Sequence, residues 1–303
     1  MHIFVSTLMV LMVQCYEAKK NLRIYLGRDA NPGEFPYVVR IELKKLTPDY
    51  TLQHKCTGSA ITSTWTITSG GCVMRYDLKD SKPVIVYGAV SRAPQKNDTQ
   101  VDVIAWYMHP SYKFENLGIA LRVQNDIGLI KSHEMNLLQY GKIGAVHYKT
   151  LFGVEVKTAG YGVMWDGKWG DTRELNTPLQ VMSAVLKKCD ETLIKHTMWN
   201  PAMCLGRSCS LESQACMGDG GAPIIHKSRI IGVISGRQGS CESLHSKLIG
   251  VEGVITPISP YLEWIATTIR VHPPLTFNFI MISESNLTLF LVQIVTYFFG
   301  TFK

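Results

Sequence analysis

The sequence has little charge and no long run of charges of one sign. Of its 303 residues, 18% are charged and 46% are hydrophobic, a balance that predicts a folded globular chain and excludes wholesale disorder. Lysine and arginine outnumber aspartate and glutamate by 31 to 24. Adjacent basic residues occur only in three pairs, Lys19-Lys20, Lys44-Lys45 and Lys187-Lys188. A dispersed excess is typical of a solvated surface, so we expect no nucleic-acid partner, with nucleic acid or heparin binding as the alternative.

Cofactor motifs and long helices are also missing. No group of histidines and cysteines has the spacing of a zinc site, and no glycine-rich phosphate loop is present. Short β-rich runs, such as 37–46 and 57–68, alternate with turns that contain proline, glycine and aspartate. This punctuation is typical of strands and hairpins. The sequence therefore predicts an all-β fold without a metal or other cofactor.

Long hydrophobic runs are confined to the two ends. Residues 1–15 are predicted to be a signal peptide, because 3–13 is mostly apolar and small residues at 13 and 15 suit a signal peptidase; a buried strand or helix is the alternative. Secretion would let the eight cysteines form disulfides. At the other end, residues 287–302 would span roughly 24 Å as a helix, short of the roughly 30 Å hydrocarbon core. We expect the apolar tail, 269–303, to be unordered or packed on a partner, with membrane attachment as the alternative.

The stretch 216–223 carries the strongest functional signal. It reads Cys-Met-Gly-Asp-Gly-Gly-Ala-Pro and resembles the nucleophile loop of trypsin-like serine proteases, Cys-x-Gly-Asp-Ser-Gly-Gly-Pro. Gly220 stands where this family has its serine, and Ala222 replaces a family glycine. Glycine has no side-chain atom that can attack a carbonyl carbon, so the loop resembles the family in architecture and departs from it in chemistry.

Two further motifs resemble the rest of the family's catalytic triad. Residues 68–72 read Thr-Ser-Gly-Gly-Cys, similar to Thr-Ala-Ala-His-Cys, which puts Gly71 where the general-base histidine belongs. Asp126, within Asn-Asp-Ile-Gly-Leu-Ile, falls on the position that orients that histidine. Because no imidazole can exchange a proton at position 71, we expect Asp126 to be a buried structural carboxylate. The nearest histidine in this region, His54, is expected at the surface or at the edge of the core.

The family's activation site is also similar here. Arg23 and Ile24 precede Asn-Pro-Gly-Glu-Phe-Pro-Tyr, and Asp219 precedes the nucleophile position. In active members, cleavage after the arginine frees an isoleucine amine that pairs with this aspartate, which makes residues 16–23 a short propeptide. Two interpretations stay open: cleavage orders the surrounding loops for a partner, or the residues are inherited without use.

The substrate-pocket positions depart from those of trypsins. Gln214 stands where trypsins place an aspartate, Gly236 replaces a wall tryptophan, and Arg237 replaces a glycine at the pocket mouth. Gly253 begins a strand that flanks the pocket. A neutral base and a cation at the entrance oppose the binding of basic side chains, so a simple decoy for trypsin substrates is disfavoured.

The resemblance also assigns cysteines, and the sequence adds two glycosylation motifs. The implied disulfides are Cys56–Cys72, Cys189–Cys204 and Cys216–Cys241. Cys209 is then without a family partner. The glycosylation motifs begin at Asn97 and Asn286, which a secreted chain would carry on its surface.

The resemblance covers about residues 23–268 and implies a homology domain at 24–268. Its expected fold is two antiparallel six-stranded β-barrels followed by a C-terminal helix. It implies a secreted, catalytically inactive homologue of the insect type that binds extracellular proteins as a cofactor, scaffold or regulator, in an immune or reproductive pathway. The alternatives are a residual or unconventional serine-type hydrolase and a structural relic without partners.

Overall fold

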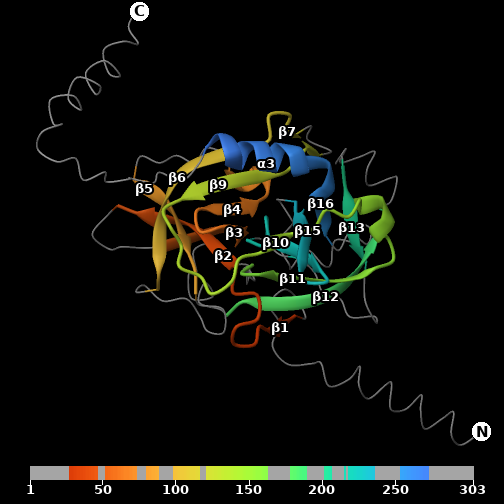
Figure 1. Ribbon diagram of the computed structural model, residues 1–303, viewed down its shortest axis with the longest axis horizontal. Coiled ribbons are helices and arrows are strands. Elements are labelled where there is room, and N and C mark those ends of the chain that lie inside the picture. Colours follow the sequence, from red (N-terminus) through yellow and green to blue (C-terminus); the bar gives the residue numbers. More distant parts are fainter. Residues whose placement is uncertain are drawn as a thin grey trace, which may run out of the picture. The chain divides into compact units, whose positions relative to one another are not determined.

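The chain folds mainly into β-strands, as the ribbon diagram of the computed structural model shows (Figure 1). The structure describes residues 27–46, 52–73, 80–88, 98–116, 121–162, 178–189, 201–206, 215, 218–235 and 253–272. The statements below concern these ranges.

The first barrel is a closed ring of antiparallel strands in the order β2-β3-β4-β9-β6-β5. Their bounds are β2 (Val38–Lys45), β3 (Leu52–Ala60), β4 (Trp65–Thr68), β5 (Ser81–Val86), β6 (Gln100–Met108) and β9 (Gly128–Ser132). β-Branched and aliphatic residues dominate the buried positions, where they pack well on a pleated surface. Val39, Ile41, Ile85 and Ile130 are at most 1% exposed and share one hydrophobic cluster. This cluster fills the barrel and fixes the register of its strands.

The second barrel contains six antiparallel strands that close in the order β11-β12-β13-β16-β15-β14. Their bounds are β11 (Glu155–Gly160), β12 (Gln180–Lys187), β13 (Met203–Gly206), β14 (Pro223–His226), β15 (Arg229–Ile234) and β16 (Val254–Pro257). Two short strands extend this sheet: β1 (Arg28–Asp29) pairs with β12, and β10 (Lys142–Ile143) runs parallel to β15. The predicted pair of six-stranded barrels is confirmed.

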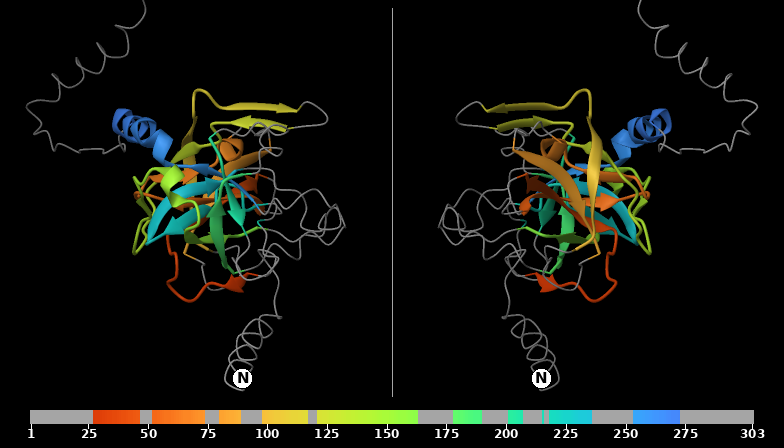
Figure 2. Two further views of the ribbon diagram at one scale, coloured as in Figure 1. Left: turned by 90° about the vertical axis from the view of Figure 1, so that its right-hand side faces the viewer. Right: turned by 90° about the vertical axis from the view of Figure 1, so that its left-hand side faces the viewer.

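Three single-turn helices, one hairpin and one α-helix complete the described part. They are η1 (Gly70–Val73), η2 (Tyr148–Leu151), η5 (Ser259–Tyr261), the β7–β8 hairpin (Lys113–Asn116 with Leu121–Gln124) and α3 (Leu262–Val271). The hairpin lies at one end of the barrels (Figure 2). The sequence prediction of a C-terminal helix is confirmed by α3.

A shared hydrophobic cluster joins the two barrels. It includes Trp65 and Leu129 from the first barrel, Val181 and Val233 from the second, and Ile265 from α3. The chain therefore leaves the second barrel and returns, through α3, to pack where both barrels meet. Loss of a buried side chain of this size typically costs about 2–5 kcal/mol, so this contact holds the barrels in one arrangement.

Two of the three expected disulfides are confirmed. Cys56–Cys72 joins β3 to η1, and Cys189–Cys204 joins the end of β12 to β13. The expected Cys216–Cys241 pair and Cys209 lie outside the described residues. Removing a native disulfide typically costs about 2–5 kcal/mol, so each of the two bonds accounts for a large part of a normal stability margin.

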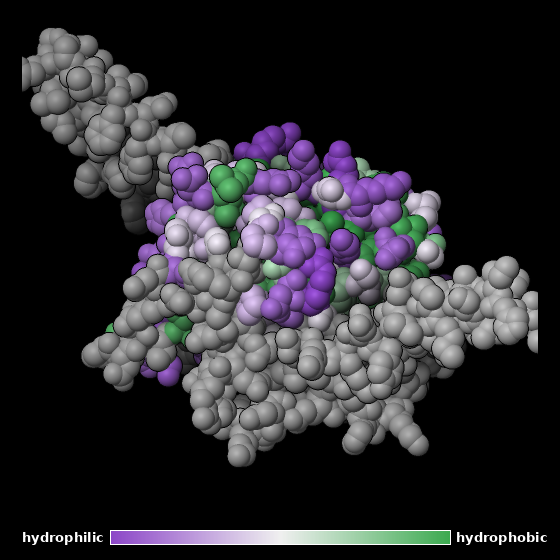
Figure 3. Space-filling model, turned by 90° about the horizontal axis from the view of Figure 1, so that it is seen from below, coloured by the Kyte–Doolittle hydropathy of each residue, from purple (hydrophilic) through white to green (hydrophobic). Residues whose placement is uncertain are grey.

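Several predictions from the sequence fall on residues outside the described ranges: the signal peptide 1–15, the propeptide 16–23, most of the tail, Asn97 and Asn286. In the described ranges, no helix has both the length and the apolar character needed to cross a membrane. The face drawn in Figure 3 carries hydrophilic and hydrophobic side chains interspersed over its described part.

A bidentate ion pair fixes the turn that leads into the first barrel. Arg28 Nη1 and Nη2 donate to Glu34 Oε2 and Oε1 at 2.7 and 2.6 Å, and the Asn31 N–H donates to Oε2 at 3.0 Å. The hydrogen bond from Arg28 is the main reason that the pKa of Glu34 falls to about 2. The Arg28 side chain is about half exposed, which screens the attraction.

We expect Glu34→Gln to lower the free energy of unfolding at pH 7 by about 1 kcal/mol, after allowance for solvent screening. Because the folded pKa lies below the unfolded value, this stability is present above about pH 4.5 and is lost as the pH falls toward about 2. Urea unfolding of wild type and Glu34→Gln, at pH 7 and near pH 2, measures this loss of stability. The exposed Glu134→Gln is the control. An equal loss at both pH values would contradict the electrostatic explanation.

Candidate functional site

The three positions of the expected catalytic triad come together in the structure. Gly71 lies in η1, and its N–H donates to Asp126 Oδ1 at 2.7 Å. The Gly220 carbonyl oxygen accepts from the Thr57 N–H at 3.0 Å and lies 3.4 Å from Cys72 Sγ, next to position 71 in the chain. The structure therefore brings these three segments, distant in the sequence, close together.

Asp126 has a hydrogen-bond donor at each carboxylate oxygen. Besides the Gly71 N–H on Oδ1, the Ser235 hydroxyl donates to Oδ2 at 2.5 Å, and Asp126 is 2% exposed. A buried carboxylate is stable only when such donors replace water. Sequence reasoning missed Ser235, since it stands 109 residues further along the chain and carries no motif of its own. Burial, reinforced by the charge of Asp126, raises the pKa of Tyr261.

The backbone at position 71 does not require glycine. A Cβ atom built there would lie 3.6 Å from Tyr112 Oη, 3.7 Å from Asp126 Oδ1 and 4.0 Å from Ser69 Oγ, all ordinary contacts. Gly71 is also absent from the glycines with positive φ. The position can therefore accept a side chain beside Asp126, and glycine removes the chemistry without a conformational reason.

The backbone at positions 218 and 221 does require glycine. Gly218 and Gly221 have φ values of 93° and 81°, which favour glycine. A Cβ at Gly221 would lie 1.9 Å from Thr68 Oγ1. Within the described ranges, the N–H groups of Gly218 and Gly220 donate to no other group. These two N–H groups can form an oxyanion hole, which needs no side chain.

His54 reaches this loop from the first barrel and is buried, not at the surface. Its side chain is 1% exposed, and Nε2 lies 3.2 Å from the Gly218 carbonyl oxygen. Its Nδ1 lies 3.7 Å from Glu42 Oε1, which is also paired with Arg40. Burial is the main cause that lowers the pKa of His54, against the opposing effect of Glu42. The ring is therefore neutral at pH 7, and its Nε2–H tautomer donates to Gly218.

Asp219 is fully buried against the start of the loop after β11. Its Oδ1 accepts from the Gly162 N–H at 2.7 Å. A Cβ built at Gly160 or Gly162 would lie 2.2 Å from an Asp219 carboxylate oxygen. The two glycines therefore make the space that this carboxylate occupies. Arg23 and Ile24, its expected partners in activation, lie outside the described residues.

Of the four expected substrate-pocket positions, Gly253 lies within the described residues. Gly253 is buried with a φ of 153°, and its carbonyl oxygen accepts from the Leu205 N–H at 2.9 Å. Gln214, Gly236 and Arg237 lie outside the described residues. The described ranges contain no group of three or more His, Cys, Asp or Glu side chains placed to hold a metal ion.

Comparisons with known proteins agree with this geometry. The family model described as Trypsin matches residues 24–265. The chain is 22% identical to a trypsin of Phaedon cochleariae over 254 residues, which cover 82% of this chain and 89% of the relative. It is 26% identical to Lectizyme of Glossina austeni over 261 residues, which cover 82% and 87%.

Two solved structures share the fold at 20% identity. Neuropsin, a serine protease expressed in the limbic system of mouse brain, superposes with a TM-score of 0.59, covering 80% of this chain and 98% of that one. HL collagenase superposes with a TM-score of 0.57, covering 82% and 99%.

Two glycine-to-alanine substitutions test the space around the carboxylates. We expect Gly162→Ala to lower the free energy of unfolding by about 1–3 kcal/mol, because its Cβ would overlap Asp219. Gly71→Ala, which meets only ordinary contacts, should change it by about 0.5 kcal/mol or less. Denaturant unfolding of both variants measures the difference. Equal costs would show that the buried carboxylate does not depend on the glycine at 162.

The buried histidine predicts a loss of stability in mild acid. Because the folded pKa of His54 lies below its ordinary value of 6.5, the unfolded chain takes up a proton that the folded chain refuses. Stability is therefore full above pH 6.5 and declines below it, by up to about 1.4 kcal/mol per pH unit.

His54→Gln keeps a donor for the Gly218 carbonyl and cannot titrate, so we expect its unfolding free energy to vary less between pH 8 and 5. The exposed His133→Gln, measured in the same urea series, is the matched control. If His54→Gln and wild type lose stability in parallel, His54 is not the titrating group.

Proposed function

We propose, since this chain belongs to the trypsin family, that it is a secreted, non-catalytic member that acts by binding other extracellular proteins. The observation that carries the proposal is the pair of glycines, Gly71 and Gly220, at the positions of base and nucleophile. Gly71 lies beside Asp126, whose hydrogen-bond donors are retained, and the Gly220 carbonyl oxygen lies beside Cys72. A site built for catalysis has lost the two side chains that react and has kept the groups that shape it.

The size of the chemical loss supports a non-catalytic role. Loss of the nucleophile or base in a related hydrolase lowers turnover on the order of a millionfold. The two losses affect one unit and do not multiply. The N–H groups of Gly218 and Gly220 would supply on the order of 10³–10⁴ over the reaction in water. That remainder falls far short of a working peptidase.

The alternative, an unconventional serine-type hydrolase, needs an accessible substitute nucleophile. Three serine and threonine hydroxyls at the site are buried and already donate: Ser235 to Asp126, Ser69 to Cys72 Sγ, and Thr57 to the Gly218 carbonyl. A buried hydroxyl with its proton engaged cannot approach a substrate carbonyl beside a base. These hydrogen bonds favour the binding role.

The retained aspartate suggests how binding could be regulated. Cleavage after Arg23 would free an Ile24 ammonium that could pair with Asp219, as in active members of the family. Because Asp219 is fully buried, desolvation offsets much of the attraction, so the net stabilisation is small. The expected consequence is ordering of nearby loops, which a partner would recognise. Gln214 and Arg237 argue that this partner does not insert a basic side chain in the trypsin manner.

The absence of peptidase activity is tested directly with a peptide library. Folded protein, cleaved after Arg23, is incubated with the library and the products are read by mass spectrometry. We expect no turnover above that of an Asp126→Asn variant purified in the same way. Turnover in wild type that disappears in this variant would overturn the proposal, because a contaminating protease would appear in both preparations.

Protein binding is tested by photo-crosslinking in the fluid into which the protein is secreted. The folded protein should capture a defined protein that the reduced, alkylated and unfolded chain does not. Loss of capture after Asp219→Asn, in a variant that still folds, would support recognition of the ordered loops. Capture of nothing by the folded chain would favour a relic without partners.

A further inference from the structure

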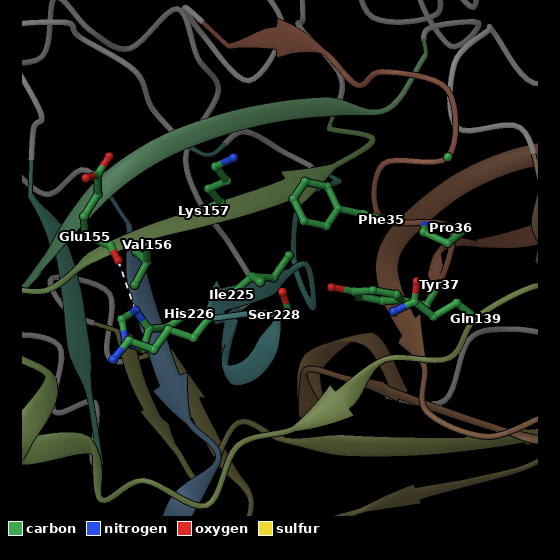
Figure 4. Close-up of a pocket in the computed structure, with 12 residues that line it drawn as sticks. Phe35, Pro36, Tyr37, Gln139, Glu155, Val156, Lys157, Ile225, His226 and Ser228 are labelled. Carbon is green, nitrogen blue, oxygen red and sulfur yellow. Dashed lines mark hydrogen bonds between the residues drawn. The ribbon is translucent and has the colours of Figure 1, made fainter.

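A cleft is lined by residues other than those of the candidate site. It has a volume of about 490 Å³ and lies between the turn before β2, the start of β11 and the turn that joins β14 to β15 (Figure 4). None of its lining residues is Gly71, Asp126, Gly220 or His54. Its volume falls within the range of small-molecule sites.

One wall of the cleft is hydrophobic and suits a flat ring. Ile225 and Val156 are at most 5% exposed and form its base, and the partly buried Phe35 stands over Ile225 in Figure 4. The Phe35 and Tyr37 rings meet edge to face, with their centroids 6.3 Å apart. An aromatic ligand can add to such an arrangement by further edge or offset contacts.

Tyr37 brings a hydroxyl to this wall. The residue is 5% exposed, and in Figure 4 its hydroxyl is directed into the cleft toward Ser228. Among the described residues, no group hydrogen-bonds to this hydroxyl. Burial raises the pKa of Tyr37 to about 12, so the group keeps its proton at neutral pH. A donor that faces the cleft and has no partner among the described residues can donate to a ligand acceptor.

The charges at the cleft favour an anion. Lys157 and Lys227 are exposed lining residues, and Glu155 lies at the His226 end in Figure 4. Within the described ranges, Lys157 has no carboxylate within ion-pair distance. The neighbouring Glu34 is already bound by Arg28. Lys157 attracts Glu34 without forming an ion pair with it, so its ammonium can still bind a ligand carboxylate.

The backbone around the cleft is held in an uncommon conformation. Of the four non-glycine residues with positive φ in the described part, three line the cleft: Phe35 at 54°, Lys227 at 47° and Ser228 at 60°. Lys227 and Ser228 form the two-residue turn between β14 and β15, a connection that needs positive φ at both positions. Such conformations persist where the surrounding structure fixes them, and they often occur at ligand sites.

We propose that this cleft binds a small aromatic carboxylate, with its ring against Phe35 and Ile225 and its carboxylate bound by the Tyr37 hydroxyl and the Lys157 ammonium. The same chemistry is offered by a free aromatic acid and by a peptide that ends in phenylalanine. The site is separate from Gly71 and Gly220, so its occupancy does not depend on whether the chain has peptidase activity.

Isothermal titration of the full chain tests the site with indole-3-propionate and with a short peptide ending in phenylalanine. We expect saturable binding with one site for at least one of them, and no binding of tryptamine or of the peptide amide. The one that binds more tightly shows whether the ligand is a free aromatic acid or the end of a peptide. Absence of saturable binding of both acids, or equal binding of the amine or amide, overturns the proposal.

Variants then assign the contacts. We expect Lys157→Met to weaken binding about tenfold or more, while Lys149→Met, an exposed lysine on η2, leaves it unchanged. Tyr37→Phe should weaken binding severalfold and leave the melting temperature of the free protein equal or higher, because it removes an unpartnered hydroxyl. Unchanged affinity in Lys157→Met would refute the assignment, and that result stands even if Tyr37→Phe fails to fold.

Discussion

Thr57 holds the loop around position 220 to the first barrel, and the geometry of the site depends on this one residue. Its N–H donates to the Gly220 carbonyl and its hydroxyl to the Gly218 carbonyl. The same hydroxyl accepts from the Tyr161 N–H, and the Thr57 carbonyl accepts from Thr68 Oγ1. Because Thr57 is fully buried, water cannot replace these partners, and leaving any of them unpaired would cost about 1–3 kcal/mol. The two barrels are therefore fastened where a catalytic centre would lie.

These hydrogen bonds explain how the loop can keep its conformation although the side chains of base and nucleophile are absent. The loop conformation depends on backbone groups, on glycines with positive φ and on buried polar residues, none of which is the reacting side chain. Asp126 remains satisfied by a backbone N–H and by Ser235, so it needs no imidazole to stay buried. The fold can lose its base and nucleophile without losing the site that surrounded them. A chain built in this way keeps the framework of the site without its reacting side chains.

The sequence predicts the barrels and the triad positions because these depend on ordered motifs with family spacing. It predicts the Cys56–Cys72 and Cys189–Cys204 pairs for the same reason. It does not predict the burial of His54 or the role of Ser235, since those depend on partners 164 and 109 residues away. The cleft beside Tyr37 is equally invisible in sequence, because three separate segments form it. Its one local signal is the turn at Lys227-Ser228, and neither residue is one that a turn of this kind usually prefers.

Our proposal requires that the scaffold is intact and that only the reacting side chains are missing. The most direct measurement is fluorophosphonate labelling of wild type and of Gly71→His/Gly220→Ser, each folded and cleaved after Arg23. We expect no labelling of residues 216–223 in wild type. We expect labelling at position 220 in the double variant, which Asp126→Asn on that background should strongly reduce. Labelling of the wild-type loop, or a folded and cleaved double variant that stays unlabelled, would contradict the proposal.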